Sequence, residues 1–239
     1  MNLFQSLENA THVPWVIWSA LFVVVVVFAT GFAVRARLAG ADGGLVPDRG
    51  FSLRNVIEML GEMLAGLAEQ TMGPHWRKYF PLVATIFLYI LFANLIGLVP
   101  GFQGATRDAN VTWAWAIISF AAHQYVGIRE HGFGYVQHFL GPSLYDLKLG
   151  GRTYHLRLLA PLYAPIELIS HLVRVFTLAV RLLANMSADH IVVGVWIALV
   201  PVLVPAIFMG LGVLVAFLQA YVFAMLSMIY IGLALEEPH

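Results

Sequence analysis

Long apolar runs separated by short polar stretches organise this chain. The first run covers about residues 13–34, and two more cover about residues 79–100 and 111–128. About 20 residues of α-helix, rising 1.5 Å each, cross a hydrocarbon layer about 30 Å thick. Each of these three runs is therefore expected to form a membrane-spanning helix.

The last 80 residues carry an unusually long apolar stretch. Residues 158–235 are almost continuously apolar, and Pro201 and Pro205 are the strongest helix breakers within them. This pattern predicts a hairpin of two helices, at about 158–199 and 204–235. The first would be about 60 Å long, roughly twice the hydrocarbon thickness, so it must tilt steeply, lie partly along the bilayer or project into water.

A different periodicity follows the first run. Apolar residues recur at helical spacing over about residues 51–72, with charged residues between them. This spacing is typical of an amphipathic helix on the membrane surface, or of one packed on other subunits or on its own loops. A polar loop at 129–157 contains apolar side chains that suggest a second surface-lying piece: Tyr135, Phe139, Leu140, Leu144 and Tyr145.

Composition agrees with a membrane protein. The chain has 239 residues, of which 60% are hydrophobic and 11% charged, with a mean hydropathy of +0.82. Soluble domains carry about 25% charged residues. The 13 basic and 13 acidic side chains cancel, so no nucleic-acid partner is expected, and the absence of cysteine excludes disulfides and thiolate sites. We expect an all-α integral membrane protein forming one membrane domain over residues 1–239, with about five hydrophobic helices plus surface helices.

Basic residues indicate the orientation. No Lys or Arg precedes the first run, so it lacks the basic start of a secretory signal and is expected to remain as a span. The four successive polar segments contain 0, 6, 1 and 4 basic residues. Because cytoplasmic loops are enriched in Lys and Arg, the N-terminus is expected outside and the C-terminus in the cytoplasm.

Arg181 is the most costly residue in this pattern. It lies in a nearly apolar segment, where an ionised side chain costs roughly 2.5–3.5 kcal/mol on insertion scales. Arginine does not escape this cost by losing its proton. Arg181 also belongs to a stripe of six polar residues within an arc of about 80° on the helix expected at 158–199. The stripe consists of Glu167, His171, Arg174, Arg181, Asn185 and Asp189, and Ser170 and Thr177 border it.

Intramembrane ionisable groups usually face a protein interior or a water-filled cavity, so this stripe favours an ion path. A buried hydrogen-bonded network that only holds helices together is the structural alternative. A voltage sensor fits less well, because Arg174 and Arg181 stand seven residues apart with no basic residue between them. The histidines are not arranged as two spaced pairs for haem, and close ligand spacing for a metal is missing. No cofactor is expected.

Several motifs resemble a known family. Pro165-Ile-Glu-Leu-Ile-Ser170, Val180-Arg-Leu-Leu-Ala-Asn-Met186 and Leu218-Gln-Ala-Tyr-Val-Phe223 resemble subunit a of the F-type ATP synthase membrane sector. Asn94-Leu-Ile-Gly-Leu-Val-Pro100 and Asp108-Ala-Asn-Val-Thr112 are also similar to that family. The resemblance runs from about residue 50 to the C-terminus.

The resemblance implies a non-catalytic stator, without an ATP site of its own, in an energy-transducing membrane such as the bacterial inner membrane. Its partners would be a rotating ring of c subunits, b-type peripheral stalk subunits and the remaining ATP synthase subunits. Arg181 would face the ion-carrying carboxylate of each c subunit. Positions near the cytoplasmic half-channel are matched by Glu167, Ser170 and Arg174, and those near the external half-channel by Asn185, His190 and Gln219.

One position departs from the family pattern. Family members often pair a Glu and a His across the last two helices, but here His190 stands opposite the position of Gly212. Asp189, Asp108 or water is left to take the missing role. Two other functions stay open from the residues alone: a self-contained ion channel or secondary transporter, and a purely structural membrane subunit.

Overall fold

The computed structural model describes residues 3–38, 52–99, 101–132, 145–149, 152–156, 160–199 and 203–235. Its long helices are α2 (Trp15–Leu38), α3 (Leu53–Met72), α4 (Trp76–Leu98), α5 (Ala109–His131), α7 (Ala160–Leu199) and α8 (Leu203–Leu235). Shorter elements are helix α1 (Leu3–Thr11), the 3-10 turns η1 (Gly73–His75) and η2 (Ala105–Arg107), and strands β1 (Tyr145–Leu149) and β2 (Arg152–Leu156). The expected all-α membrane architecture is confirmed.

Capping residues define where the middle helices begin and end. The Ser52 side chain accepts a hydrogen bond from the Arg54 N–H at the start of α3, and Asp108 accepts one from the Asn110 N–H at the start of α5. Gly73 and Gly132 close these helices with φ values of 60° and 55°, a conformation that side chains disfavour. Within the described part of the chain, three helical segments are long and apolar enough to cross a membrane: Trp15–Ala36, Leu53–Leu98 and Leu203–Leu235.

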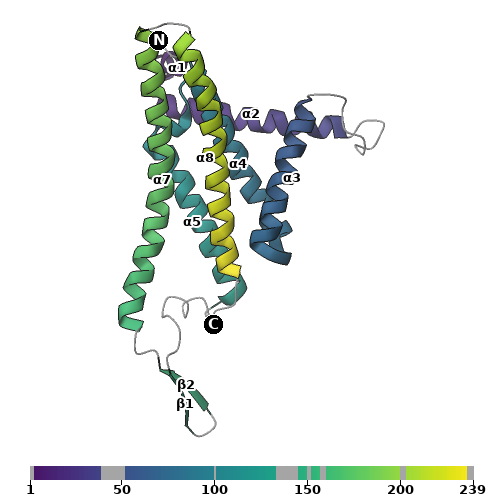
Figure 1. Ribbon diagram of the computed structural model, residues 1–239, viewed down its shortest axis with the longest axis vertical. Helices are drawn as coiled ribbons and strands as arrows, with labels where there is room; N and C mark the ends of the chain where they lie inside the picture. Colours follow the sequence, from purple (N-terminus) through teal and green to yellow (C-terminus); the bar gives the residue numbers. More distant parts are fainter. Residues whose placement is uncertain are drawn as a thin grey trace.

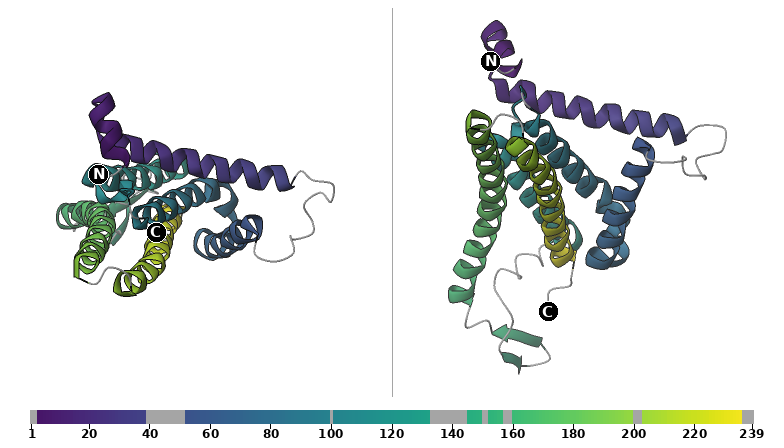
Figure 2. Two further views of the ribbon diagram at one scale, coloured as in Figure 1. Left: turned by 90° about the horizontal axis from the view of Figure 1, so that it is seen from above. Right: turned by 45° about the horizontal axis from the view of Figure 1, so that its top comes forward.

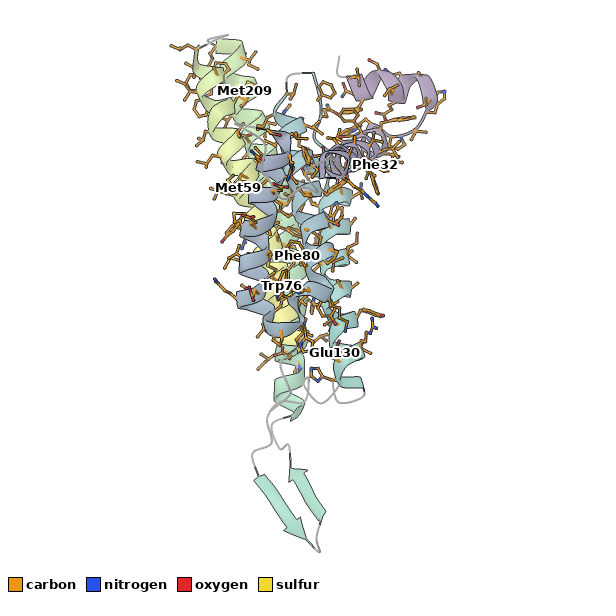
Figure 3. All side chains as sticks on the ribbon, turned by 90° about the vertical axis from the view of Figure 1, so that its right-hand side faces the viewer. Phe32, Met59, Trp76, Phe80, Glu130 and Met209 are labelled. Atoms are coloured by element: carbon orange, nitrogen blue, oxygen red, sulfur yellow. The ribbon has the colours of Figure 1, made fainter. Side chains whose placement is uncertain are left out.

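Helices α7 and α8 form the antiparallel hairpin expected from the sequence, and they run side by side along the length of the molecule (Figure 1). Helix α8 begins at Leu203, so Pro205 lies in its first turn, where proline is tolerated. Helix α2 runs crosswise to this hairpin in both views of Figure 2, and it is seen end-on in Figure 3. The 24 residues of α2 are long enough to cross a bilayer, and a hairpin crosswise to such a span would be steeply tilted, as the length of α7 predicts.

The helices share one apolar core. It is built mainly from α4 and α8, for example Ile90 of α4 and Phe223 of α8, which are almost fully buried. The amphipathic helix α3 joins this core through Leu64, Ala68 and Met72, while Met59 points outward from its other face (Figure 3). Helix α3 therefore packs on its own chain along part of its length.

Two features were not expected from the pattern. A short helix, α1, precedes the first span, and the polar loop contains an antiparallel hairpin in which Tyr145 pairs with Leu156 and Leu149 with Arg152. Apart from Tyr145, the apolar side chains that suggested a second surface-lying piece lie outside the described residues.

Helix α4 and the segment before η2 approach each other without side chains between them. A Cβ on Gly104 would lie 2.9 Å from the Cα of Gly97 and 3.0 Å from the carbonyl oxygen of Ala93. Next to this crossing, Thr106 donates a 2.8 Å hydrogen bond to the buried Asn94 amide oxygen. The glycine pair thus allows η2 to lie directly on α4.

We predict that Gly104→Ala destabilises the protein by roughly 1–3 kcal/mol, because backbone atoms on both sides must move to admit the methyl group. The matched control is Gly66→Ala in α3, where nothing lies within 4 Å of the added Cβ and helix propensity favours alanine. Thermal unfolding of the purified membrane protein in detergent measures both. Equal midpoints for the two variants would contradict the close approach.

Candidate functional site

The polar stripe of α7 is divided by the fold into three parts. Arg181 and Asn185, near the middle of the helix, are exposed. His171 is buried towards the N-terminal end, with Glu167 and Arg174 half-buried beside it, and Asp189 is half-buried towards the C-terminal end. The ionisable residues therefore form two clusters with an exposed arginine between them.

Arg181 is exposed on the side of α7 that also carries the exposed Thr177 and Asn185, one turn before and after it. Phe176 and Val180 are exposed further round the helix, whereas Leu178, Ala179 and Leu182 fill the core. Among the described residues Arg181 forms no ion pair. A permanent cation in a largely apolar membrane helix is costly, so its compensation must come from outside the described part of the chain.

Asn185 and Gln219 connect the two helices of the hairpin one turn beyond Arg181. The Asn185 amide donates a 2.8 Å hydrogen bond to Oε1 of Gln219, and Gln219 is 4% exposed. A buried amide that is hydrogen-bonded in this way fixes the register of α7 against α8. The pair holds the helix that carries Arg181 in place.

A cavity of about 200 Å³ lies at the C-terminal end of the stripe. Asp189 and His190 of α7, Asn94 of α4, and Thr106 and Arg107 of η2 contribute to its lining. Its lining is mainly apolar, with these polar groups set into it, and it is large enough for several water molecules, each of which needs about 30 Å³ in the liquid. It therefore has room for water beside the Asp189 carboxylate and the His190 imidazole.

The Asp189 side chain lies in the space that a side chain at position 212 would occupy. A Cβ on Gly212 would lie 2.7 Å from Oδ2 of Asp189 and 2.6 Å from Cδ2 of Leu98. Of the alternatives left open by the sequence, Asp189 thus occupies this space. Asp108 caps α5 and does not line the cavity.

The N-terminal cluster joins three helices. His171 Nε2 lies 3.4 Å from Glu167 Oε1, and the ring of His171 stacks on that of His123 in α5, with centroids 5.7 Å apart. The guanidinium carbon of Arg174 lies 4.9 Å from the ring centroid of Tyr230 in α8. Ser170 is half-buried on the adjoining side of α7.

Several of these residues were missed as site candidates. His123 and Arg107 were visible as polar residues within or beside spans, but their sequence positions do not show which helix they meet. Single hydroxyls are common in membrane helices, so the sequence alone does not mark a site at Thr106, Ser119 or Ser227. Among the described residues no group of three or more His, Asp or Glu side chains could hold a metal ion.

Comparison with known proteins agrees with this arrangement. The family model described as "ATP synthase A chain" matches residues 15–232. The chain is 42% identical to ATP synthase subunit a 1 of Syntrophotalea carbinolica over 236 residues, covering 98% of this chain and 92% of that protein. It is 39% identical to ATP synthase subunit a of Geobacter sulfurreducens over 244 residues, covering 100% of this chain and 97% of that protein. Since these matches span nearly the whole sequence, the chain belongs to the ATP synthase A chain family.

Proposed function

We propose that this chain is the stator proton-channel subunit of an F-type ATP synthase, and that Arg181 couples proton movement to rotation of a ring of c subunits. One observation carries the proposal. Arg181 is exposed on a largely apolar helix, without an ion-pair partner among the described residues, and ionisable clusters lie on either side of it along the helix. A carboxylate on a passing neighbour would complete this site.

The two clusters are suited to two separate half-channels. Glu167 lies about 21 Å from Arg181 along the helix axis, and Asp189 and His190 lie about 12–14 Å away on the other side. Buried apolar residues, including Leu178 and Leu182, fill the core side of α7 between them. Protons that enter one cluster would then reach the other only by travelling on the ring.

The charge of Arg181 supplies the coupling. A fixed cation favours the ionised form of a nearby carboxylate, so each c-subunit carboxylate would release its proton as it approaches and take up another after it leaves. The same cation repels protons and keeps the half-channels apart. This chain would neither bind nor hydrolyse ATP; it would act within a complex that also contains peripheral stalk subunits.

The asymmetry of Lys and Arg supports an orientation with the N-terminus outside, and the similarity to bacterial subunits supports a location in a bacterial inner membrane. Glu167 then lies on the cytoplasmic side of Arg181 and Asp189 on the external side. A self-contained channel would need both the path and the gate in one chain. Selective proton flux through the isolated, reconstituted protein would favour that alternative.

We predict that Arg181→Ala abolishes ATP-driven proton pumping and ATP synthesis while the complex still assembles. Passive proton movement through the membrane sector should persist or increase, because the barrier between the half-channels is lost. Arg181→Lys should also lose coupling, since a desolvated ammonium can deprotonate and lacks the planar fork of the guanidinium. Inverted vesicles allow pumping and, after removal of the soluble sector, proton leak to be measured.

Arg129→Ala is the matched control, because Arg129 is an exposed arginine at the cytoplasmic end of α5. It should pump like the wild type. Near wild-type pumping by Arg181→Ala would show that the proposed coupling role is wrong.

We further predict that replacing both Asp189 and His190 with Ala slows ATP-driven pumping several-fold without dissociating the complex, because the external cavity loses its two proton-carrying groups. Val193→Ala, which changes an apolar residue of the same cavity, serves as the control. Normal flux in the double variant would remove both residues from the path.

The contact at Gly212 gives a second test of the same cavity. Gly212→Ala should slow pumping, because its Cβ displaces the Asp189 carboxylate. In an Asp189→Gly background only the flexible Leu98 side chain still has to shift, so Gly212→Asp should restore part of the lost activity by supplying a carboxylate from α8. Equal activity of Asp189→Gly with and without Gly212→Asp would contradict this exchange.

A further inference from the structure

Two buried histidines meet in the N-terminal cluster and have no part in the Arg181 mechanism described above. His123 of α5 and His171 of α7 are 2% and 4% exposed, and their rings are nearly parallel, with 10° between the planes. Ionisable residues inside membrane segments are costly and usually functional. We call these two residues the histidine pair.

The pair is connected towards the surface by Glu167. His171 Nε2 lies 3.4 Å from Glu167 Oε1, and the Glu167 side chain is 15% exposed, whereas that of His171 is 5% exposed. Glu167 thus gives the buried pair a carboxylate that reaches the edge of the protein. A proton on His171 has an acceptor in the direction of the N-terminal end of α7.

Two serines extend the polar contacts in the other direction. His123 Nδ1 lies 3.4 Å from the Ser119 carbonyl oxygen, and the Ser119 hydroxyl lies 2.7 Å from that of Ser227 in α8. Both serines are buried, at 3% and 1% exposed. Polar groups therefore follow one another from α7 through α5 to α8 inside an otherwise apolar core.

The inner end of this series lies close to Arg181. Helices α7 and α8 are antiparallel, with Arg174 over Tyr230 and Asn185 hydrogen-bonded to Gln219. By this pairing Ser227 stands opposite Thr177, about 6 Å along the axis from Arg181. The series thus spans most of the distance between Glu167 and the exposed arginine.

We propose that the histidine pair is a proton relay inside the cytoplasmic half-channel, linking Ser119 and Ser227 to Glu167; this rests on the proposed function. A proton released by a c-subunit carboxylate passes through the serine hydroxyls, directly or over one water, to His123. His123 accepts the proton at Nε2 while its Nδ1–H stays bonded to the Ser119 carbonyl oxygen. It then gives the proton from Nε2 over one water to Nδ1 of His171, which releases its own Nε2 proton to Glu167. Glu167 takes the proton from His171 and passes it to bulk water, and pumping reverses the order.

The environment of His123 fits such a step. Its Nε2 is buried and has no hydrogen-bond partner among the described residues, which leaves one ring nitrogen open to an arriving proton or water. The groups that face the pair are Glu167 and Arg174 from α7, Phe120 from α5 and Tyr230 from α8. Stacking alone would not require imidazoles, since any flat side chain of similar size would pack there.

The test uses the whole complex in inverted vesicles, with His123→Gln and His171→Gln made separately. Glutamine keeps a hydrogen-bonding amide but does not titrate. After removal of the soluble sector, passive proton conduction is measured between pH 6 and 8. We expect at least a tenfold loss of conduction in each variant, loss of the inflection shown by the wild-type pH curve, and normal amounts of assembled complex. His75→Gln, at an exposed histidine outside the cluster, should conduct like the wild type.

Wild-type conduction with an unchanged pH curve in both glutamine variants would overturn the relay. If neither glutamine variant assembles into the complex, the histidine pair has a structural role and the relay is overturned. If only one variant assembles, its conduction decides the question. Arg181→Ala is measured alongside. If it is uncoupled while the glutamine variants conduct normally, only the relay is wrong, whereas coupled pumping by Arg181→Ala overturns the proposed function itself.

Discussion

The charge of Arg181 is the constraint on which the arrangement of this protein depends. It cannot be neutralised by losing a proton, and no described carboxylate pairs with it. The fold leaves it exposed on α7 rather than turning it into the core. An unpaired charge in a largely apolar membrane helix is costly, so its compensation must come from outside the described residues.

Rigid support behind Arg181 follows from close contacts between helices. The Asn185–Gln219 hydrogen bond fixes α7 against α8, and α8 is tightly packed on α3, where a Cβ on Gly232 would lie 2.6 Å from the Thr71 carbonyl oxygen. Without a strong hydrophobic drive between helices in lipid, such small residues and buried hydrogen bonds supply the specificity. They hold the helix that carries Arg181 in a fixed position against α8.

The polar groups on either side of Arg181 are assembled differently. The cavity at the C-terminal end of the stripe combines Asp189 and His190 with groups of α4 and η2, and it depends on Gly212 being free of a side chain. The cluster at the N-terminal end brings α5 and α8 to α7 through stacked rings and buried hydroxyls. The cavity has room for water, whereas the cluster is a nearly closed series of side chains. Variants can therefore test the cavity and the cluster separately.

The sequence by itself determined the membrane class, the helical hairpin and the polar stripe with Arg181 at its centre, because apolar run length and helical periodicity are local properties. It did not determine which stripe residues face outward, nor that His123 meets His171 or that Asp189 fills the space at Gly212. Those contacts join residues that are far apart in the chain or lie on different helices, and they depend on how the helices rotate and cross. Only the tertiary structure decided them, because one face of a helix is defined by what packs against it.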